Sequence, residues 1–320
     1  MNSRGVRLVS IVSLMLLASG CVGLTASQKA AIAEFSRATA AVGETTQTEL
    51  TEMRERMIRT NQERLILQGP SVDLDFKKAL DGKLTVDNVS VVVAAATALQ
   101  GYGDMLEALV EDTQTKELHG AAEKFVTSLK QVPNATLSPG ASDAISAAIV
   151  LGGQLLIEAK KARAIKAIVP ATRPAIDQIC DTLARDFDYK AAGLATDLHA
   201  ATERLHGVAS AAFQDAPPGG DAAPAAIAAR AVSLPALQYA NQGRVRREEV
   251  LARISVAAAA IKKANAALAD ALEHDRWTLE DVKGLVGDAK ALKPAITELS
   301  KRTGELLDRV KILGPARLSR

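Results

Sequence analysis

Two histidines and a glutamate share one face of a predicted helix and come nearest to a metal site. His199, Glu203 and His206 stand at i, i+4 and i+7, which places their side chains on the same side of an α-helix. The last two also have the Glu-x-x-His spacing of di-iron bundle proteins. Those proteins need a second such motif and two further glutamates, and this chain holds no second copy. The three residues are thus weak candidates for metal ligands. We favour the alternative, that they form a polar, solvent-exposed side of the helix.

No residues have the spacing of an activated nucleophile. The sequence lacks Gly-x-Ser-x-Gly, and it lacks Ser-x-x-Lys with its partner motifs. Cys180 falls on an apolar helical stripe, where burial would leave its thiol unreactive. Gly101-Tyr102-Gly103 begins like a dinucleotide-binding loop, but position 106 is leucine and no strand precedes it, so we predict close packing or a kink. We expect neither an enzyme nor a bound cofactor.

The N-terminal residues have the pattern of an export signal. Two arginines, Arg4 and Arg7, form a short positive region at the start of an apolar run, Val6–Ala18. This run is shorter than the about 20 residues that a transmembrane helix needs. The run closes on Leu17-Ala18-Ser19-Gly20-Cys21, which resembles the lipobox of bacterial lipoproteins. In that family the type II signal is removed before the cysteine, which then carries a diacylglyceryl group with palmitate-like chains. The resemblance implies a signal peptide at 1–20 and a lipid anchor at Cys21.

The same resemblance also implies in which membrane the lipoprotein is anchored. The residue after the cysteine helps to sort such lipoproteins between membranes, and Val22 is not the aspartate that resembles an inner-membrane retention signal. The resemblance therefore implies an outer-membrane anchor facing the periplasm. We expect one lipid-anchored helical domain over 21–320, with a candidate loop break at 215–224, where Pro217-Pro218-Gly219-Gly220 stands.

Removal of the signal leaves a neutral chain. The full sequence has 39 basic and 37 acidic residues, and Arg4 and Arg7 belong to the signal, so 37 of each sign remain. Aromatic residues make up 3% of the chain. Nucleic-acid binding needs a cationic field and stacking surfaces, and both are lacking. The expected partners are the membrane, through Cys21, and an unidentified protein of the cell envelope.

The body of the chain is predicted to be all-α, because it is rich in alanine and shows no strand-like alternation. The strongest pattern predicts one straight helix from Arg173 to about Gln214. Its ten apolar steps cover 36 residues, a mean of 3.6, which is the period of an α-helix about 55 Å long. The stripe consists of Ile176, Cys180, Leu183, Phe187, Ala191, Leu194, Leu198, Ala201, Leu205, Val208 and Ala212.

Capping and seam patterns predict further long helices. A capping box at Thr25-Ala26-Ser27-Gln28 begins one that should end by Gly69-Pro70. Another covers about Leu234–Arg276, with a coiled-coil-like seam whose one polar position, Asn265, can fix register. A fourth helix should begin at Thr278, joined to the third by a tight antiparallel hairpin at Trp277. The seam consists of Leu251, Ile254, Ala258, Ile261, Asn265, Leu268 and Leu272.

Shorter helices are predicted between the first two long ones. They cover about Asp87–Val110, Lys116–Lys130 and Pro139–Val169, the last capped by Ser138. They include two uncharged runs, Asn88–Gly103 and Ala144–Ile157, which are too short to span a bilayer, so we favour helices buried on most sides. The expected fold is an elongated bundle of long antiparallel amphipathic helices with shorter apolar helices between the first two.

Three classes of function stay open. A non-catalytic lipid-anchored protein that acts as an interaction or scaffold bundle is favoured, because long amphipathic faces are present and a catalytic set of residues is not. The alternative is a membrane-active helical protein, resembling pore-forming proteins that hide an apolar hairpin, and leakage of liposomes would support it. A metal-binding bundle is third, and elemental analysis would support that one.

Overall fold

A capping box begins the first long helix at the position that the sequence predicts. The Thr25 hydroxyl accepts the backbone N–H of Gln28 at 3.2 Å, and the Gln28 side-chain oxygen accepts the backbone N–H of Thr25 at 2.9 Å. Helix α2 then covers Ala26–Gln68 and ends at Gly69, whose positive φ of 74° suits a residue without a Cβ. Both predicted ends are confirmed.

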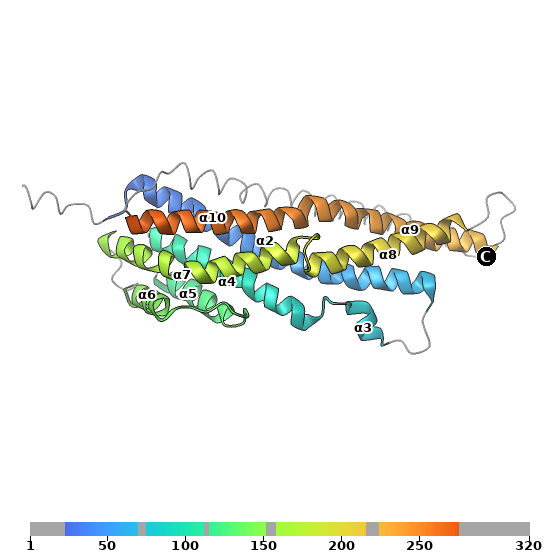
Figure 1. The fold of residues 1–320 in the computed structure, drawn as a ribbon, viewed down its shortest axis with the longest axis horizontal. Helices are drawn as coiled ribbons and strands as arrows, with labels where there is room; N and C mark the ends of the chain where they lie inside the picture. The colour runs from blue at the N-terminus through green and yellow to red at the C-terminus, as the bar shows by residue number, and fades with distance from the viewer. Residues whose placement is uncertain (1–22, 70–74, 112–114, 152–157, 216–223, 275–320) are drawn as a thin grey trace, which may run out of the picture.

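The computed structural model describes residues 23–69, 75–111, 115–151, 158–215 and 224–274, and within these ranges it contains helices and no strands. The helices pack into an elongated bundle (Figure 1), which confirms the predicted all-α class. The elements after α2 are α3 (Phe76–Asp81), α4 (Val86–Val110), α5 (Thr115–Leu129), α6 (Pro139–Leu151), α7 (Glu158–Phe187), α8 (Leu194–Gln214), α9 (Pro224–Arg246), the π-helical turn η2 (Arg247–Leu251) and α10 (Ala252–His274).

The long helices alternate in direction. Figure 1 shows α2 running from one end of the bundle to the other and α4 returning beside it. Helices α7 and α8 follow one another in the direction of α2, whereas α9, η2 and α10 return as one long helix. The bundle therefore has the predicted antiparallel arrangement of long helices, with the shorter ones between α2 and α7 in the chain.

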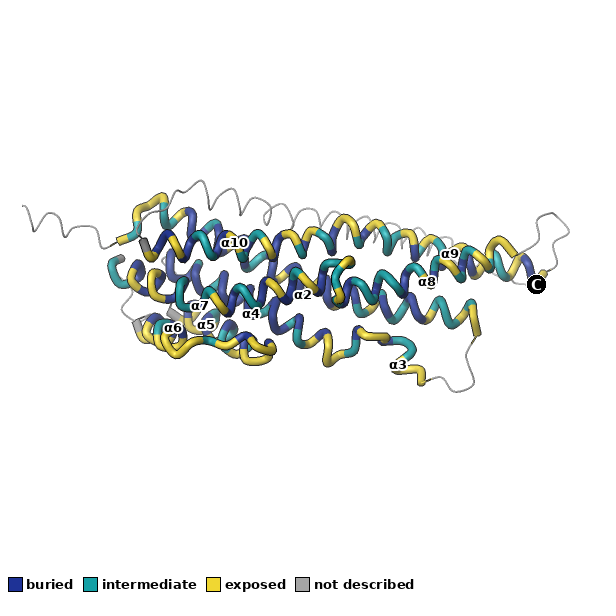
Figure 2. Tube along the Cα trace, viewed as in Figure 1, coloured by how far each residue is buried: buried dark blue, intermediate teal, exposed yellow. Residues whose placement is uncertain are grey.

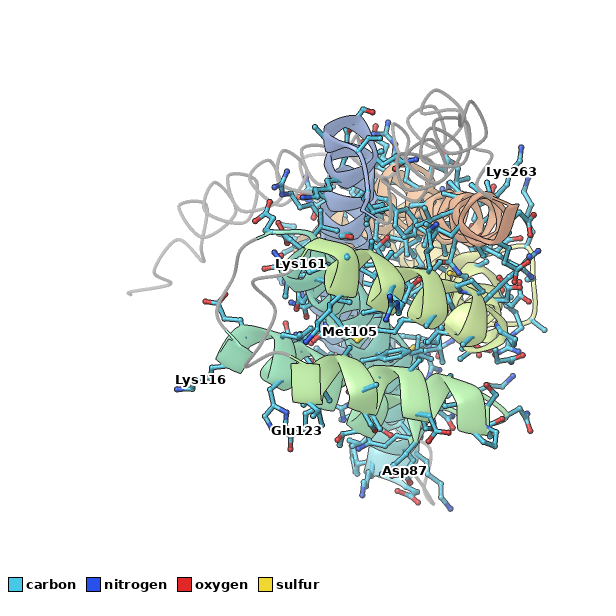
Figure 3. All side chains as sticks on the ribbon, turned by 90° about the vertical axis from the view of Figure 1, so that its left-hand side faces the viewer. Asp87, Met105, Lys116, Glu123, Lys161 and Lys263 are labelled. Carbon is cyan, nitrogen blue, oxygen red and sulfur yellow. The ribbon has the colours of Figure 1, made fainter. Side chains whose placement is uncertain are left out.

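Apolar side chains fill the interior of the bundle. Figure 2 shows buried residues on the inner faces of the long helices and exposed residues on the outer ones. Viewed along the axis, Met105 lies inside, whereas Lys116, Glu123 and Lys263 project from the surface (Figure 3). Most of the buried apolar residues form one large cluster. A small second cluster, where α8 meets α9 beside the end of α2, consists of Leu205, Ala209, Ala236 and Ala240.

Glycines allow α4 to approach two neighbouring helices closely. A Cβ on Gly103 would lie 2.5 Å from the carbonyl oxygen of Ser36 on α2, and a Cβ on Gly101 would lie 2.7 Å from the backbone nitrogen of Phe125 on α5. No side chain fits at these distances. The close packing predicted for this segment is confirmed, and Tyr102 between the two glycines is fully buried.

Among the described helices, α4 is the one that is long and apolar enough to cross a membrane. It packs against α2, α5 and α7, and 67% of its most apolar window is buried, as in the core helix of a globular protein. Burial of the run Asn88–Gly103 is thus confirmed. The run Ala144–Ile157 falls partly on α6, where Ile145 and Ala148 are buried but Val150 is 79% exposed. The last residues of that run lie outside the described ranges.

The single helix predicted over Arg173–Gln214 is wrong, because a turn at 188–193 separates α7 from α8. The Asp188 carboxylate accepts a backbone N–H two residues later at 2.9 Å, a bond that competes with helix hydrogen bonds. The backbone at Gly193 packs too closely against the end of α7 to allow a Cβ. The apolar period continues across the turn, since Leu194 and Leu198 return to the core as predicted. The period alone could not reveal the break.

The single helix predicted over Pro139–Val169 is also wrong. Helices α6 and α7 are separate and pack side by side, so the chain reverses between them. The sequence has Gly152-Gly153 there, and glycine is a poor helix former. The predicted N-cap is confirmed, because the Ser138 hydroxyl accepts a backbone N–H three residues later at 3.1 Å.

The third long helix begins ten residues earlier than predicted, at Pro224 instead of Leu234, with proline at its first position. Most of the candidate loop at 215–224 lies outside the described residues, although α8 ends and α9 begins on either side of it. The fourth helix predicted from Thr278 and the hairpin at Trp277 also lie outside them.

One polar residue, Asn265, interrupts the apolar seam of α10 and forms a hydrogen bond with a residue of α4. All the predicted seam residues are buried. The Asn265 side-chain oxygen accepts the Tyr102 hydroxyl at 2.7 Å, and burial raises the pKa of Tyr102, which stays protonated as a donor. A shift of α10 along α4 would leave both groups unpaired, so this bond fixes their register.

Asn265→Leu should lower the free energy of unfolding by about 1–3 kcal/mol, because the buried Tyr102 hydroxyl loses its acceptor on Asn265. Adding Tyr102→Phe should recover most of that loss, since neither polar group remains. Urea unfolding of the three proteins, followed by circular dichroism, measures the difference. A double variant as unstable as Asn265→Leu alone would mean that side-chain shape, and not the hydrogen bond, controls this position.

Candidate functional site

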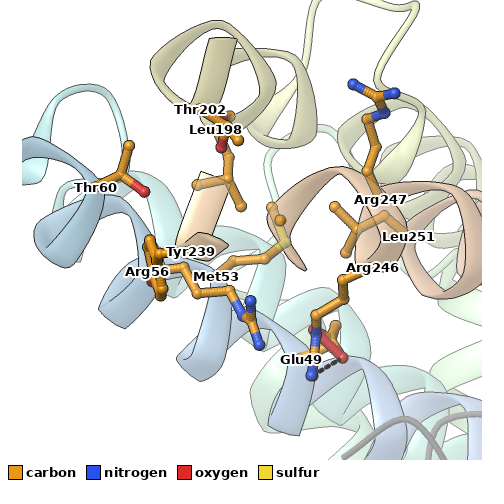
Figure 4. Close-up of a pocket in the computed structure, with 11 residues that line it drawn as sticks. Glu49, Met53, Arg56, Thr60, Leu198, Thr202, Tyr239, Arg246, Arg247 and Leu251 are labelled. Atoms are coloured by element: carbon orange, nitrogen blue, oxygen red, sulfur yellow. Dashed lines mark hydrogen bonds and ion pairs between the residues drawn. The ribbon is translucent and has the colours of Figure 1, made fainter. Parts of the chain in front are cut away.

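A polar layer lies between the two apolar clusters. Met53, Leu198 and Leu251 belong to the large cluster, and Tyr239 packs against the small one. Between them α2, α8 and the junction of α9 with η2 enclose a small cleft of about 20 Å³ (Figure 4). The cleft is lined by Glu49, Met53, Arg56, Thr60, Leu198, Thr202, Tyr239, Gly243, Arg246, Arg247 and Leu251.

The π-helical turn η2 directs two consecutive arginines to different partners. The backbone N–H of Ala252 bonds to the carbonyl of Arg247, five residues earlier, so this turn is wider than an α-helical one. Arg246 reaches Glu49 on α2, whereas Arg247 reaches His199 on α8. Turns of this kind are rare and occur frequently at functional sites.

Arg246 and Glu49 form a buried ion pair between residues 197 positions apart. Their two N–H···O bonds measure 2.7 and 2.6 Å, and the side chains are 5% and 1% exposed. Arg246 also pairs with Glu52, whose pKa is raised by burial. Burial opposes the charge of Arg246, but its bonds to Glu49 raise its pKa on balance. A two-bond contact of this kind sets the rotation of α9 against α2.

Arg56 is a second cation of the cleft, near Glu49 and Glu52, the two carboxylates that pair with Arg246. It is half-buried on α2, and in Figure 4 its guanidinium extends from beside Tyr239 toward the Arg246–Glu49 pair. Within the described residues it makes no hydrogen bond and no ion pair. Burial, followed by repulsion from Arg246, lowers the pKa of Arg56, although arginine stays charged in proteins. The lining carries three guanidinium groups and the Glu49 carboxylate. Further carboxylates balance these charges, because Glu52 pairs with Arg246, and Glu203 and Glu248 pair with Arg247.

Arg247 is held by α8 and by the turn before it. Its Nη1 lies 2.6 Å from Nδ1 of His199, and its guanidinium carbon lies 4.7 Å from the ring centre of Tyr189. Guanidinium only donates, so Nδ1 must accept and His199 is neutral. Burial and the charge of Arg247 lower the pKa of His199, in agreement with that state. The Nε of Arg247 is buried and has no partner among the described residues.

Arginines engage two of the three candidate metal ligands. Nδ1 of His199 lies 3.6 Å from a carboxylate oxygen of Glu203, but Arg244 binds both oxygens of Glu203 and lowers its pKa. His206 lies one turn further along α8 and is half-buried. Guanidinium groups at this distance repel a metal cation. In the described part of the chain, no group of three or more His, Cys, Asp or Glu residues could hold a metal ion.

Of the two cysteines in the sequence, Cys180 belongs to the described residues and Cys21 does not. Cys180 on α7 is fully buried, as predicted, and burial raises the pKa of its thiol, which disfavours the reactive thiolate. Cys21, the predicted lipidation site, lies outside the described residues.

Sequence reasoning missed the cleft and its arginines. One signal was available: Arg247 stands four residues before Leu251, where the α10 seam would continue with an apolar residue. Arg56 offers no such signal, since it lies among the other charged residues of α2. Its position beside Arg246 follows from contact between helices far apart in the chain.

Fold and cleft together define the class: an all-α bundle with an arginine-lined cleft. Comparisons with protein-family models, curated proteins and solved structures found no match to this chain. Its function is therefore inferred from the geometry of its own residues.

Arg246→Met should lower the free energy of unfolding by about 3–5 kcal/mol, because the buried Glu49 carboxylate loses the counter-ion that donates two hydrogen bonds to it. Adding Glu49→Leu should return most of that loss, since the unpaired carboxylate is removed. The control is Lys262→Met, which breaks an ion pair with Asp181 that is 38% and 56% exposed and should cost less than about 1 kcal/mol. Urea unfolding measures all three, and equal losses at the two sites would contradict the role of burial.

Proposed function

We propose that the chain is a non-catalytic lipoprotein of the cell envelope, in which lipid on Cys21 holds a binding bundle at a membrane. The bundle acts as an interaction or scaffold protein and presents its cleft and outer helix faces to a partner in the envelope. The proposed location is the outer membrane, with the bundle facing the periplasm. The proposal combines the lipobox-like residues with the way in which the chain begins to fold directly after them.

A short tether is the observation that carries this proposal. Leu24 packs against the large apolar cluster, and the capping box starts α2 at Thr25. Only Val22 and Gly23 therefore separate Cys21 from residues that belong to the folded bundle. Two or three extended residues reach about 10 Å, much less than the flexible linkers on which many anchored domains hang. A lipid on Cys21 would hold the start of α2 close to the headgroups.

The length of α2 sets the distance at which the cleft would be presented. Glu49 and Arg56 stand 24 and 31 residues after Thr25. A rise of 1.5 Å per residue places them about 35–45 Å along the helix from its start. If the bundle stands upright on the membrane, the cleft faces the aqueous space of the envelope, well above the lipid. This is the position expected for a site that meets a soluble partner.

The other two classes of function have less support. A membrane-inserting hairpin would require α4 to leave its packing against α2, α5 and α7, and thus to expose the centre of the core. A metal site at His199 would require its Nδ1 to give up Arg247. No comparable rearrangement is needed for a bundle that binds a partner.

Cys21→Ser should abolish incorporation of a fatty-acid analogue and release the exported protein from the membrane fraction, because the acyl chains supply the membrane affinity. Metabolic labelling and fractionation of cells measure both effects. Cys180→Ser is the matched control, and it should keep the label and the membrane location because Cys180 is buried on α7. Label retained by the Cys21→Ser protein would overturn the proposed anchor.

Spin labels at two exposed positions of α2 test the orientation. Ala30 lies near the start of the helix and Ile66, 65% exposed, lies near its end, about 54 Å further along the axis. In the lipidated protein on vesicles, a label at Ala30 should sense a headgroup relaxation agent strongly, and one at Ile66 should not. Equal signals at both positions would contradict an upright bundle on a short tether.

A further inference from the structure

We propose that the outer face of α9 is a homodimer interface, on which a second copy of this chain docks in the same direction. The exposed residues that form this interface are called the α9 seam: Ile227, Ala231, Leu234, Gln238, Asn241 and Val245. The interface is argued from α9 itself and goes beyond the proposed function. Only its strengthening at a membrane rests on the proposed lipid anchor.

The first half of α9 is more apolar than its place at the surface explains. Between Pro224 and Leu237 its only polar side chains are those of Arg230 and Ser233. A helix that is apolar on all sides normally lies in a core. One side of α9 does pack against α8 and α2, but Ile227 and Leu234 on the outer side are 60% and 46% exposed. Exposed apolar faces of this kind mark interaction sites.

The α9 seam has the spacing of a contact between two helices. Its steps alternate between four and three residues, so its members form one narrow line along the outer side of α9. From Ile227 to Val245 it extends over 18 residues, or about 27 Å at 1.5 Å per residue. Figure 1 shows that α9 reaches the end of the bundle away from the start of α2. The seam thus suits one helix of a partner, laid along α9.

The absence of charge on this face favours a second copy as the partner. No charged side chain is exposed on α9 between Ile227 and Val245, a range that the structure describes completely. The two arginines within it, Arg230 and Arg244, are half-buried at the side of the helix, and Arg244 pairs with Glu203. Two uncharged faces meet without repulsion and without removing a charge from water. A charged partner surface would lose its hydration here and gain no opposite charge.

The two carboxamides of the α9 seam specify a parallel pair. In a parallel pair on a two-fold axis, Gln238 and Asn241 each meet the same residue of the second copy. A carboxamide both donates and accepts, so each can bond its counterpart. In an antiparallel pair centred on the seam, Leu234 would meet Gln238 and Ala231 would meet Asn241, which leaves buried amides against apolar groups. Polar seam positions of this kind fix the register and direction of helix pairs.

The C-terminal segment is too short to cover the whole α9 seam. The helix that the sequence predicts from Thr278 can continue at most to Leu313, because Gly314-Pro315 follows. Folded back along α10 from His274, its 36 residues would reach the level of about residue 238, since 274 − 36 = 238. Ile227 and Leu234 lie beyond that level, so a partner is still needed there.

The size of the seam predicts a weak dimer in dilute solution. Its six members and their neighbours are fewer than the about 20–30 residues that each side of a standard interface contributes. Attachment of two copies to one membrane would raise their local concentration. The proposed anchor would also hold both copies in the same direction, which is the direction that the carboxamides of the seam favour.

Cysteine cross-linking of the lipidated full-length protein in vesicles tests the pairing. Under mild oxidation Asn241→Cys should give a disulfide-linked dimer, because a parallel seam brings the two thiols within bonding reach. The matched control is Val232→Cys, which lies on the same helix and is 40% exposed but off the seam. Its dimer should form at least about tenfold more slowly. The native Cys180 is buried and does not interfere.

A charge placed in the middle of the seam tests the same contact. Leu234→Asp, added to the Asn241→Cys protein, should slow cross-linking at least about tenfold, because two carboxylates then face each other in the pair. Val232→Asp is its matched control and should leave cross-linking unchanged. Neither substitution should lower the melting temperature of the dilute protein in detergent, since both side chains are exposed in the single chain.

Several results would overturn the proposal. Equal cross-linking at Asn241→Cys and Val232→Cys would indicate random collisions. A lower melting temperature for Leu234→Asp, but not for Val232→Asp, would show that a segment of the same chain covers the seam. Binding of the Cys21→Ser protein to vesicles that Leu234→Asp abolishes would identify a lipid surface as the partner. If Asn241→Cys gives no dimer while Cys21 still carries its fatty-acid label, the seam is refuted and the anchor stands.

Discussion

The buried ion pair between Arg246 and Glu49 is the constraint on which the packing of α2, α8 and α9 around the cleft depends. Two charges that are almost completely removed from water are tolerated only in one geometry, because any other rotation of α9 against α2 leaves both unpaired. That geometry is reached with the help of the π-helical turn, which lets Arg246 point onto α2 while Arg247 turns to α8. The cleft between these helices is a consequence of the same arrangement.

The interior of the bundle differs along its length. At Gly101 and Gly103 the helices approach so closely that even a methyl group would not fit. In the polar layer long charged side chains, Glu49, Arg56 and Arg246, lie between the helices beside a small cleft. The same long helix, α2, begins at the proposed anchor and carries Glu49 and Arg56, so membrane attachment and cleft would share one rigid element.

Local signals in the sequence determined much of the fold. The capping box at Thr25, the N-cap at Ser138 and the end of α2 at Gly69 depend on a few neighbouring residues, and each was predicted. The α10 seam and its polar position at Asn265 were predicted as well, because residues three and four positions apart lie on the same face of an α-helix. The lipobox-like segment that ends at Cys21 is equally local, and the proposal of an anchor comes from the sequence by itself.

Only the tertiary structure decided where the chain turns and what the turns bring together. The apolar period continues across the break at 188–193, so it could not distinguish one helix from two, and that break supplies Tyr189 to Arg247. The sequence singled out His199 and Glu203 from their spacing on one helix, but their partners, Arg247 and Arg244, come from another. Arg56, Glu49 and Arg246 form a site through contacts across nearly 200 residues. Helical periodicity specifies which face of a helix is buried, whereas the identity of the facing helix depends on packing of the whole chain.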